Sequence, residues 1–261
     1  MRTVLSFQWG APEHPQEDAF ARDDEHRIFL VADGVTRTPS DTPYPNPSPA
    51  KSASDRLLEV THRALLLLPR TSTAFREACR TGNTAVRQLN QELGFWGHTN
   101  YFENDLAGAV FSGVVLKETD FVWGFMTDCG VAHLSADGTI LWMTEDRLTP
   151  VRKYFPATSN MRERYIRVRQ EFRNRPENGM DRTFGAFTGE DTALPYLEVG
   201  QRSFTPGDVL LVFSDGMIHF VKSAEFRALL CAGSHDEIER FVSLPEHCDH
   251  KDDKTIIVIR T

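Results

Sequence analysis

The feature that most restricts the fold is a succession of four short strand-like segments within residues 107–143. The segments are Val110–Leu116, Phe121–Met126, Val131–Leu134 and Thr139–Met143, all rich in β-branched or aromatic residues and separated by turn residues. Neighbouring parallel strands need a crossover of about a dozen residues or more, and these gaps are far shorter. The spacing therefore predicts an antiparallel meander and excludes a doubly wound, Rossmann-type fold.

Strand and helix patterns flank this region on both sides. Further strands are expected at Val4–Phe7, Arg27–Asp33, Glu198–Phe204, Val209–Phe213 and Thr255–Arg260. Helices are expected at Ala50–Leu68, Thr73–Leu93, after Met217 and at Ala224–Leu230. The proline-rich stretch Thr38–Pro49 is expected to form neither a helix nor a central strand, because proline fixes φ and lacks a backbone donor. The two long helices would cover a sheet.

Composition narrows the functional class. A chain of 261 residues with 40% apolar and 25% charged residues is expected to form one domain over residues 1–261. The formal charge of -8 argues against nucleic acid as a partner. The longest aliphatic run, Ala64–Leu68, stops at Pro69, so no membrane span is expected. Without a secretory signal pattern or a dense cysteine framework, a cytoplasmic location is expected.

Three dipeptides that contain aspartate lie where an apolar run stops or begins. They are Asp33-Gly34 after Ile28–Ala32, Asp215-Gly216 after Val209–Ser214, and Asp252-Asp253 before Thr255–Ile259. An Asp-Gly pair is most often a turn, and Asp137-Gly138 is expected to be the turn of a hairpin. The other three lie at strand ends, where a sheet fixes the backbone and leaves the side chain at the rim. Brought together, such carboxylates would form a divalent-metal site.

An arginine-rich insertion lies at about residues 147–182. Within it, Met161–Arg173 is expected to be a helix carrying Arg162, Arg164, Arg167, Arg169 and Arg173. One interpretation is a solvated helix face whose arginines pair with Glu163 and Glu171. The other is an electropositive flap beside a site for an anionic substrate. The sequence leaves both open.

Several motifs in order resemble those of one enzyme family. They are Gln16–Phe20, Leu30–Val35, Thr127–Gly130, Asp137-Gly138, Met143–Asp146, Pro206–Met217 and Asp252–Thr255. Their order and spacing, over nearly the whole chain, resemble the metal-dependent type 2C (PPM family) protein serine/threonine phosphatases of bacterial type. The resemblance implies an α+β fold, a four-layer αββα sandwich of two antiparallel sheets flanked by helices. It also implies a centre of two Mg²⁺ or Mn²⁺ ions at one end.

The resemblance implies ligands for these ions. Asp33 would bridge the two metals, and Gly34 would offer its backbone carbonyl. Asp215 and Asp252 would complete the ligands of the second metal. The sequence leaves open whether Asp252 or Asp253 is the ligand. Oxygen ligands of this kind suit hard cations such as Mg²⁺ and Mn²⁺ and argue against Zn²⁺. Two such ions would activate a water for in-line attack on phosphorus.

Two further carboxyls have implied roles. Asp18 would hold metal-bound waters from the outer shell, and Asp128 stands where many bacterial members place a ligand for a third, weaker metal. Ser214 is expected to be a hydrogen-bonding or capping group, because the Gly-x-Ser-x-Gly elbow of a nucleophilic serine is absent.

The chain also departs from the family pattern. Val35-Thr36-Arg37 follows the first Asp-Gly where the family often has two glycines, and Thr127–Gly130 lacks the arginine of the usual block. The arginine that grips the substrate phosphate is also absent. His14 and Arg37 are the candidates to replace it, because phosphate recognition favours hydrogen-bonded positive charge. An ordinary surface histidine is an equally good interpretation of His14.

Two functional classes follow. The first is an active phosphatase acting on phosphoserine or phosphothreonine in a protein substrate, opposing a Ser/Thr kinase. The second is a catalytically weak, phosphatase-like regulatory or binding module; hydrolysis of a small phosphoester is a variant of the first. Asp33, Asp215 and Asp252 favour the enzyme, because a binding scaffold has no need for a costly cluster of like charges.

Overall fold

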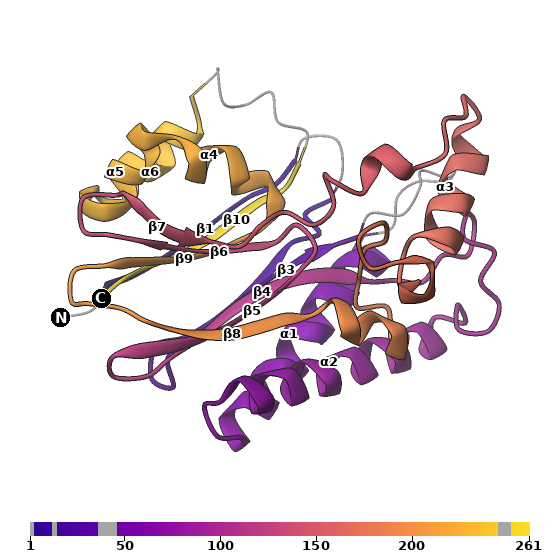
Figure 1. Cartoon of the computed structure of the whole chain (residues 1–261), viewed down its shortest axis with the longest axis horizontal. Coiled ribbons are helices and arrows are strands. Elements are labelled where there is room, and N and C mark those ends of the chain that lie inside the picture. The colour runs from indigo at the N-terminus through magenta and orange to yellow at the C-terminus, as the bar shows by residue number, and fades with distance from the viewer. Residues whose placement is uncertain (1–2, 12–14, 36–45, 245–251) are drawn as a thin grey trace.

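The computed structural model describes residues 3–11, 15–35, 46–244 and 252–261. Two five-stranded antiparallel sheets face each other (Figure 1). The first sheet has the order β1 (Thr3–Trp9), β10 (Lys254–Arg260), β9 (Val209–Phe213), β6 (Gly130–Leu134) and β7 (Ile140–Met143). The second has the order β2 (Ala19–Asp23), β3 (Ile28–Gly34), β4 (Ala109–Leu116), β5 (Asp120–Met126) and β8 (Glu198–Ser203).

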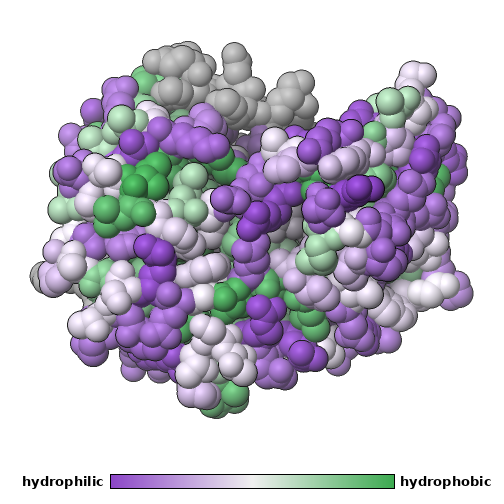
Figure 2. All heavy atoms as spheres, in the orientation of Figure 1, coloured by the Kyte–Doolittle hydropathy of each residue, from purple (hydrophilic) through white to green (hydrophobic). Residues whose placement is uncertain are grey.

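Helices cover the outer face of each sheet (Figure 1). The second sheet is covered by α1 (Pro49–Leu67) and α2 (Ser72–Glu92), and the first by α4 (Ile218–Lys222), α5 (Ala224–Ala232) and α6 (His235–Val242). The helix α3 (Met161–Glu171) lies apart from both helical layers, and mostly polar side chains cover its lobe (Figure 2). Short 3₁₀ helices occur at Arg152–Tyr154, Pro176–Asn178, Asp191–Tyr196 and Asp215–Met217. The expected αββα sandwich is confirmed.

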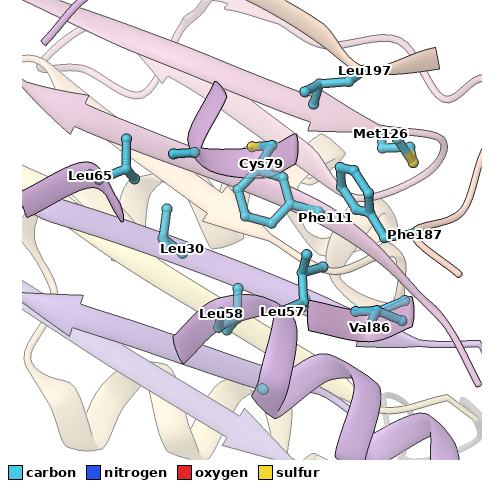
Figure 3. Packing of buried hydrophobic residues seen from close by; sticks show 14 of the residues in the cluster. Leu30, Leu57, Leu58, Leu65, Cys79, Val86, Phe111, Met126, Phe187 and Leu197 are labelled. Carbon is cyan, nitrogen blue, oxygen red and sulfur yellow. The ribbon is translucent and has the colours of Figure 1, made fainter. Parts of the chain in front are cut away.

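Burial on both faces explains why the central strands are continuously apolar. In β3, Leu30 and Ala32 pack against α1 and α2, while Phe29 and Val31 point toward the first sheet. Figure 3 shows Leu30 in one buried cluster with Leu57 and Leu58 of α1. Full burial of a large aliphatic or aromatic side chain stabilises the fold by about 1.5–3 kcal/mol, so each such strand ties two layers together.

The last strand, β10, repeats this arrangement in the first sheet. Ile256 and Val258 face α4, α5 and α6, whereas Ile257 and Ile259 face the second sheet. The strand lies between β1 and β9 and pairs with both. The core therefore has three apolar layers, one between the sheets and one beneath each helical layer.

The expected meander is wrong, although all its strands exist. The hairpin of β4 and β5 belongs to the second sheet, and the hairpin of β6 and β7 belongs to the first. The chain crosses between the sheets at residues 127–129, a gap as short as a hairpin loop. The expected turn at Asp137-Gly138 is confirmed: Gly138 has φ 85°, and Ser135 N donates to Thr139 O at 2.9 Å.

Other differences from the sequence analysis are local. The strand β2 and the helix α6 were not expected, because both are short and half-exposed. Pro49 begins α1 instead of lying in a loop, since the first turn of a helix needs no donor from that residue. Residues 38–45 of the proline-rich stretch lie outside the described residues. No helix among those described is both long and apolar enough to cross a membrane.

Candidate metal centre

Strand register brings three of the acidic positions to one end of the first sheet. Phe213, the last residue of β9, lies opposite Ile256 of β10 and opposite Gly130 of β6. Asp215 follows β9 by two residues, so it lies close to the start of β10, which Asp252 precedes. Asp128 precedes β6 and lies at the same end.

The second sheet contributes two more carboxyls to this end. Ala19 pairs with Ala32, which places Asp18 and Asp33 beside each other, and β3 packs across the sandwich against β9 and β10. Asp33 and Asp215 lie near each other, because the charge of Asp215 raises the pKa of Asp33 and Asp33 also alters the pKa of Asp215. The structure therefore brings together Asp18, Asp33, Asp128, Asp215 and Asp252, residues up to 234 positions apart in sequence (252 − 18).

The carboxyls at this end hold their protons unusually tightly. Burial, with repulsion from Asp253 and Asp215, raises the pKa of Asp18 to about 8. Burial and the charge of Asp252 raise the pKa of Asp215 to about 6, and burial with neighbouring carboxyls raises the pKa values of Asp33 and Asp128 well above their usual range. Desolvation and neighbouring like charges both favour the protonated form, so nearby positive charge does not offset the repulsion among these carboxyls.

Two buried carboxyl oxygens have no hydrogen-bond partner among the described residues. Asp18 Oδ2 accepts from Ser214 Oγ at 2.7 Å, but Asp18 Oδ1 and Asp215 Oδ1 accept nothing. Leaving such an oxygen unsatisfied costs about 1–3 kcal/mol. Ser214 Oγ also accepts from Thr255 N at 3.0 Å, which confirms that this serine is a hydrogen-bonding group.

These residues fit a hard divalent cation. Carboxylate oxygens are the ligands that Mg²⁺ and Mn²⁺ favour, and a cation would satisfy the free oxygens and offset the repulsion. Within the ranges that the structure describes, no group of three or more His, Cys, Asp or Glu side chains converges as a ready-made metal cage.

Comparisons with known proteins place this geometry in context. A scan of family models and a search of curated proteins found no match. The PPM Ser-Thr phosphatase MsPP from Mycobacterium smegmatis matches in structure with 18% identity and a TM-score of 0.61, over 98% of this chain and 97% of that one. The catalytic domain of the serine/threonine phosphatase PstP, in complex with two manganese ions, matches with 17% identity and a TM-score of 0.65, over 99% and 97%. PppA, a key regulatory component of T6SS in Pseudomonas aeruginosa, matches with 18% identity and a TM-score of 0.64, over 99% and 97%.

The chain has the PPM phosphatase fold. The likeness extends over nearly the full length of each of these proteins, so both sheets and the helical layers correspond. At this identity it establishes the fold and leaves the chemistry to the residues themselves.

Asp252 and Asp253 are neighbours in sequence, but they have different roles in the PPM-type sandwich. Asp253 is 3% exposed, and its two oxygens accept from Ala11 N at 2.7 Å and from Glu17 N at 2.6 Å. Asp252 is exposed, and its charge raises the pKa of both Asp33 and Asp215. Asp253 therefore binds the backbone of the N-terminal segment, and Asp252 is the better candidate for a metal ligand.

Close backbone packing at this end demands glycine at two positions. A Cβ on Gly34 would lie 2.9 Å from Glu17 O and 3.0 Å from the backbone of Ala50. A Cβ on Gly216 would lie 2.1 Å from Asp253 O. Both approaches are too close for any side chain, so the Asp-Gly pairs position the backbone as well as the carboxyl.

The arginines of the insertion are largely engaged by local partners. Arg167 Nε lies 2.7 Å from Glu171 Oε1, and Arg167 also pairs with Glu163, as the solvated interpretation expects. Arg162 pairs with Glu103. Arg169 and Arg173 are buried, and both bind Asp105. The helix α3 therefore presents little net positive charge from these residues.

Two residues near the carboxyls were not singled out from the sequence. The Asp146 carboxylate accepts from Leu148 N at 2.7 Å, and its charge raises the pKa of Asp128. The positive charge of Arg152 lowers the pKa of Asp128 and Asp215. Asp146 ends the motif Met143–Asp146 and could have been noticed there, whereas nothing distinguishes Arg152 from the other arginines nearby. His14 and Arg37 lie outside the described residues.

Proposed function

We propose that the chain is a metal-dependent protein phosphatase that hydrolyses phosphoserine and phosphothreonine with water as the nucleophile. The observation that carries the proposal is the group of buried, mutually repelling carboxyls that includes Asp33 and Asp215, with a buried Asp215 oxygen that has no partner in the described residues, at the end of a PPM-type sandwich. Perturbed carboxyls that cluster in this way are typical of functional sites.

In this proposal, Mg²⁺ or Mn²⁺ binds at the cluster. Asp33, the Gly34 carbonyl, Asp215 and Asp252 would hold two ions, and Asp128 a third. When bound, the ions supply a water that is nucleophilic at neutral pH and offset charge on the phosphoryl oxygens. The manganese ions in the PstP structure support this choice of metal. Binding requires the carboxyls of Asp33 and Asp215 to release their protons, because the charged form is the ligand.

Asp18 has a positioning role in the proposed site. Ser214 Oγ donates to Asp18 Oδ2 at 2.7 Å and fixes the orientation of this fully buried carboxyl. Its other oxygen has no partner among the described residues and is able to accept a hydrogen bond from a water in the site. Thr255 N holds the serine in turn, so the position of Asp18 depends on the start of β10.

The substrate class follows from the same proposal. The substrate would be a phosphorylated protein, the product of a Ser/Thr kinase, and the site of action the cytoplasm. The net charge of -8 disfavours nucleic acid as a substrate.

The test is an assay of p-nitrophenyl phosphate and a phosphothreonine peptide with Mn²⁺, with Mg²⁺ and with a chelator. We expect turnover that requires metal and falls by about 10³-fold or more in Asp215→Asn, because the proposed nucleophile depends on the ions held there. The control is Asp137→Asn, which should retain activity. Asp137 lies in the β6–β7 turn, at the opposite end of the sheet from Asp215. Metal-independent turnover, or full activity in Asp215→Asn, would contradict the proposal.

A second candidate is a phosphatase-like binding module. It is favoured by the lack of a ready-made cage of three ligands among the described residues, and by the likeness to PppA, which is itself a regulatory component. Correctly folded, metal-loaded protein that binds the phosphothreonine peptide without hydrolysing it would establish this alternative.

A further inference from the structure

A phosphomonoester dianion needs positive hydrogen-bond donors beside the carboxyls, and the described site is almost wholly acidic. We propose that Arg152, in the 3₁₀ helix Arg152–Tyr154, binds the phosphoryl group of the substrate. The inference rests on the proposed function and adds to it the residue that recognises phosphate.

The backbone that carries Arg152 is fixed beside Asp128. Arg147 N donates to Thr127 O at 2.8 Å, which joins the start of the insertion to the residue before Asp128. Farther along, Val151 N and Arg152 N both donate to Leu148 O, at 3.0 and 3.1 Å. This compact turn holds Arg152 at the acidic end of the sandwich.

The same turn borders a cleft. The cleft has a volume of about 420 Å³, and Thr127, Val151, Phe184 and Tyr196 are among the residues that line it. Val151 is buried, whereas Arg152 is exposed. The cleft therefore adjoins the sequence neighbours of both Arg152 and Asp128, since Val151 and Thr127 line it.

Arg152 is available, unlike its neighbours. Arg147 Nε lies 2.7 Å from Glu198 Oε1, and Arg175 Nη1 lies 3.2 Å from Glu190 Oε1. In the described part of the chain, the Arg152 guanidinium makes no hydrogen bond or ion pair, yet its charge influences both Asp128 and Asp215. An exposed guanidinium without a partner among the described residues, on a turn that is hydrogen-bonded beside Asp128, is available to a ligand.

The chemistry of the guanidinium suits this role. It remains charged at every physiological pH, and its planar fork donates two parallel hydrogen bonds to phosphate oxygens. An ammonium group supplies the charge without the fork. Lysine at position 152 should therefore restore part of the affinity lost in the alanine variant.

The experiment measures inorganic phosphate binding to Mn²⁺-loaded protein by calorimetry, and phosphate inhibition of turnover. We expect Arg152→Ala to weaken phosphate binding about tenfold to hundredfold, the range for a lost charge-assisted pair. Arg152→Lys should recover part of the loss, and Mn²⁺ affinity should not decrease in either variant. The control is Lys153→Ala, which removes the same charge from the next residue, whose ammonium lies over the Tyr154 ring. That variant should bind phosphate as the wild type does.

Two results would overturn the inference. One is unchanged phosphate affinity in Arg152→Ala. The other is a loss confined to Lys222→Ala, because Lys222 lines a small cavity with Asp128 and Asp146 and is the alternative cation. The calorimetric measurement needs no turnover, so a protein that binds phosphate through Arg152 without hydrolysing the peptide would refute the proposed enzyme and leave this inference standing.

Discussion

Two groups of buried carboxyls in this protein have opposite environments. Asp105 is 2% exposed, and Arg173 Nη2 donates to its Oδ1 at 2.7 Å while Arg169 binds its other oxygen. At the end of the sandwich, Asp18 and Asp215 each have a buried oxygen without a partner in the described residues. The chain supplies the counter-charge in the first case and does not in the second.

The difference appears in the proton affinities of the two groups. Nearby arginine charges outweigh the cost of burial and lower the pKa of Asp105, whereas burial and like charges raise the pKa of Asp18 to about 8. A buried charge pair within the chain maintains a structure, and a buried cluster of one sign needs a ligand from outside. The comparison therefore separates a structural cluster, around Asp105, from the candidate functional cluster at the end of the sandwich.

The largest expected effect is on the structural cluster. Asp105→Ala leaves the Arg169 and Arg173 charges buried without their carboxylate, and we expect a loss of about 3–5 kcal/mol in the free energy of unfolding, measured with urea. The control is Asp191→Ala. Asp191 pairs with Arg87 at 2.8 Å but is 79% exposed, so its loss should cost less than about 1 kcal/mol. Equal losses of unfolding free energy in the two variants would show that the buried Asp105 pairs matter no more than an exposed pair.

An intermediate effect is expected from pH on the metal-free protein. The pKa values of Asp18 and Asp215 rise from an ordinary 3.8 to about 8 and about 6, so their protonated forms favour the folded state. That stability is complete below about pH 4 and is lost as the pH rises through about 6 and then about 8. Asp105, with a lowered pKa, behaves in the opposite way, and its contribution is lost only as the pH falls below its ordinary value of 3.8.

The measurement is urea unfolding between pH 5 and pH 9 with a chelator and with excess Mn²⁺. The stability of the chelated protein should fall across this range, and Mn²⁺ should reduce the fall because the ions stabilise the charged carboxylates. Asp215→Asn should flatten the curve of the chelated protein. A stability that rises with pH in the chelator would show that the cluster is already neutralised.

The smallest effect is expected on the surface of α3. Arg167→Ala removes exposed pairs with Glu163 and Glu171, and such pairs on a helix contribute about 0.3–0.5 kcal/mol each. The combined neutralisation of Arg162, Arg164 and Arg167 should leave phosphate binding and peptide KM unchanged, measured as for the Arg152 variants. A raised peptide KM would restore the interpretation of α3 as an electropositive flap.

The sequence predicted the elements better than their assembly. Long apolar strands such as β3 and β10 were recognisable because both of their faces are buried. Sheet membership was not, since the crossing at residues 127–129 is as short as a hairpin loop and only packing tells them apart. The cluster of Asp105 was missed for a related reason: its partners, Arg169 and Arg173, lie 64 and 68 residues away and look like surface arginines.

The candidate site shows the same division. The positions of Asp33 and Asp215 at strand ends were recognisable, and so was the supporting role of Ser214. The different roles of Asp252 and Asp253 were not recognisable. They depend on which carboxyl binds Ala11 N and Glu17 N, and no local sequence pattern reveals these contacts. Arg152 likewise becomes distinct only once its neighbouring arginines are seen to be engaged.

The position of β10 has a consequence for synthesis on the ribosome. This strand lies between β1 and β9, Thr255 N holds Ser214, and Asp253 fastens the segment that leads to Asp18. A nascent polypeptide that has not yet delivered residues 252–260 lacks all of these contacts. Such a polypeptide would lack the contacts that position Ser214 and the segment before Asp18, so the proposed site would form only after residues 252–260 have joined the sheet.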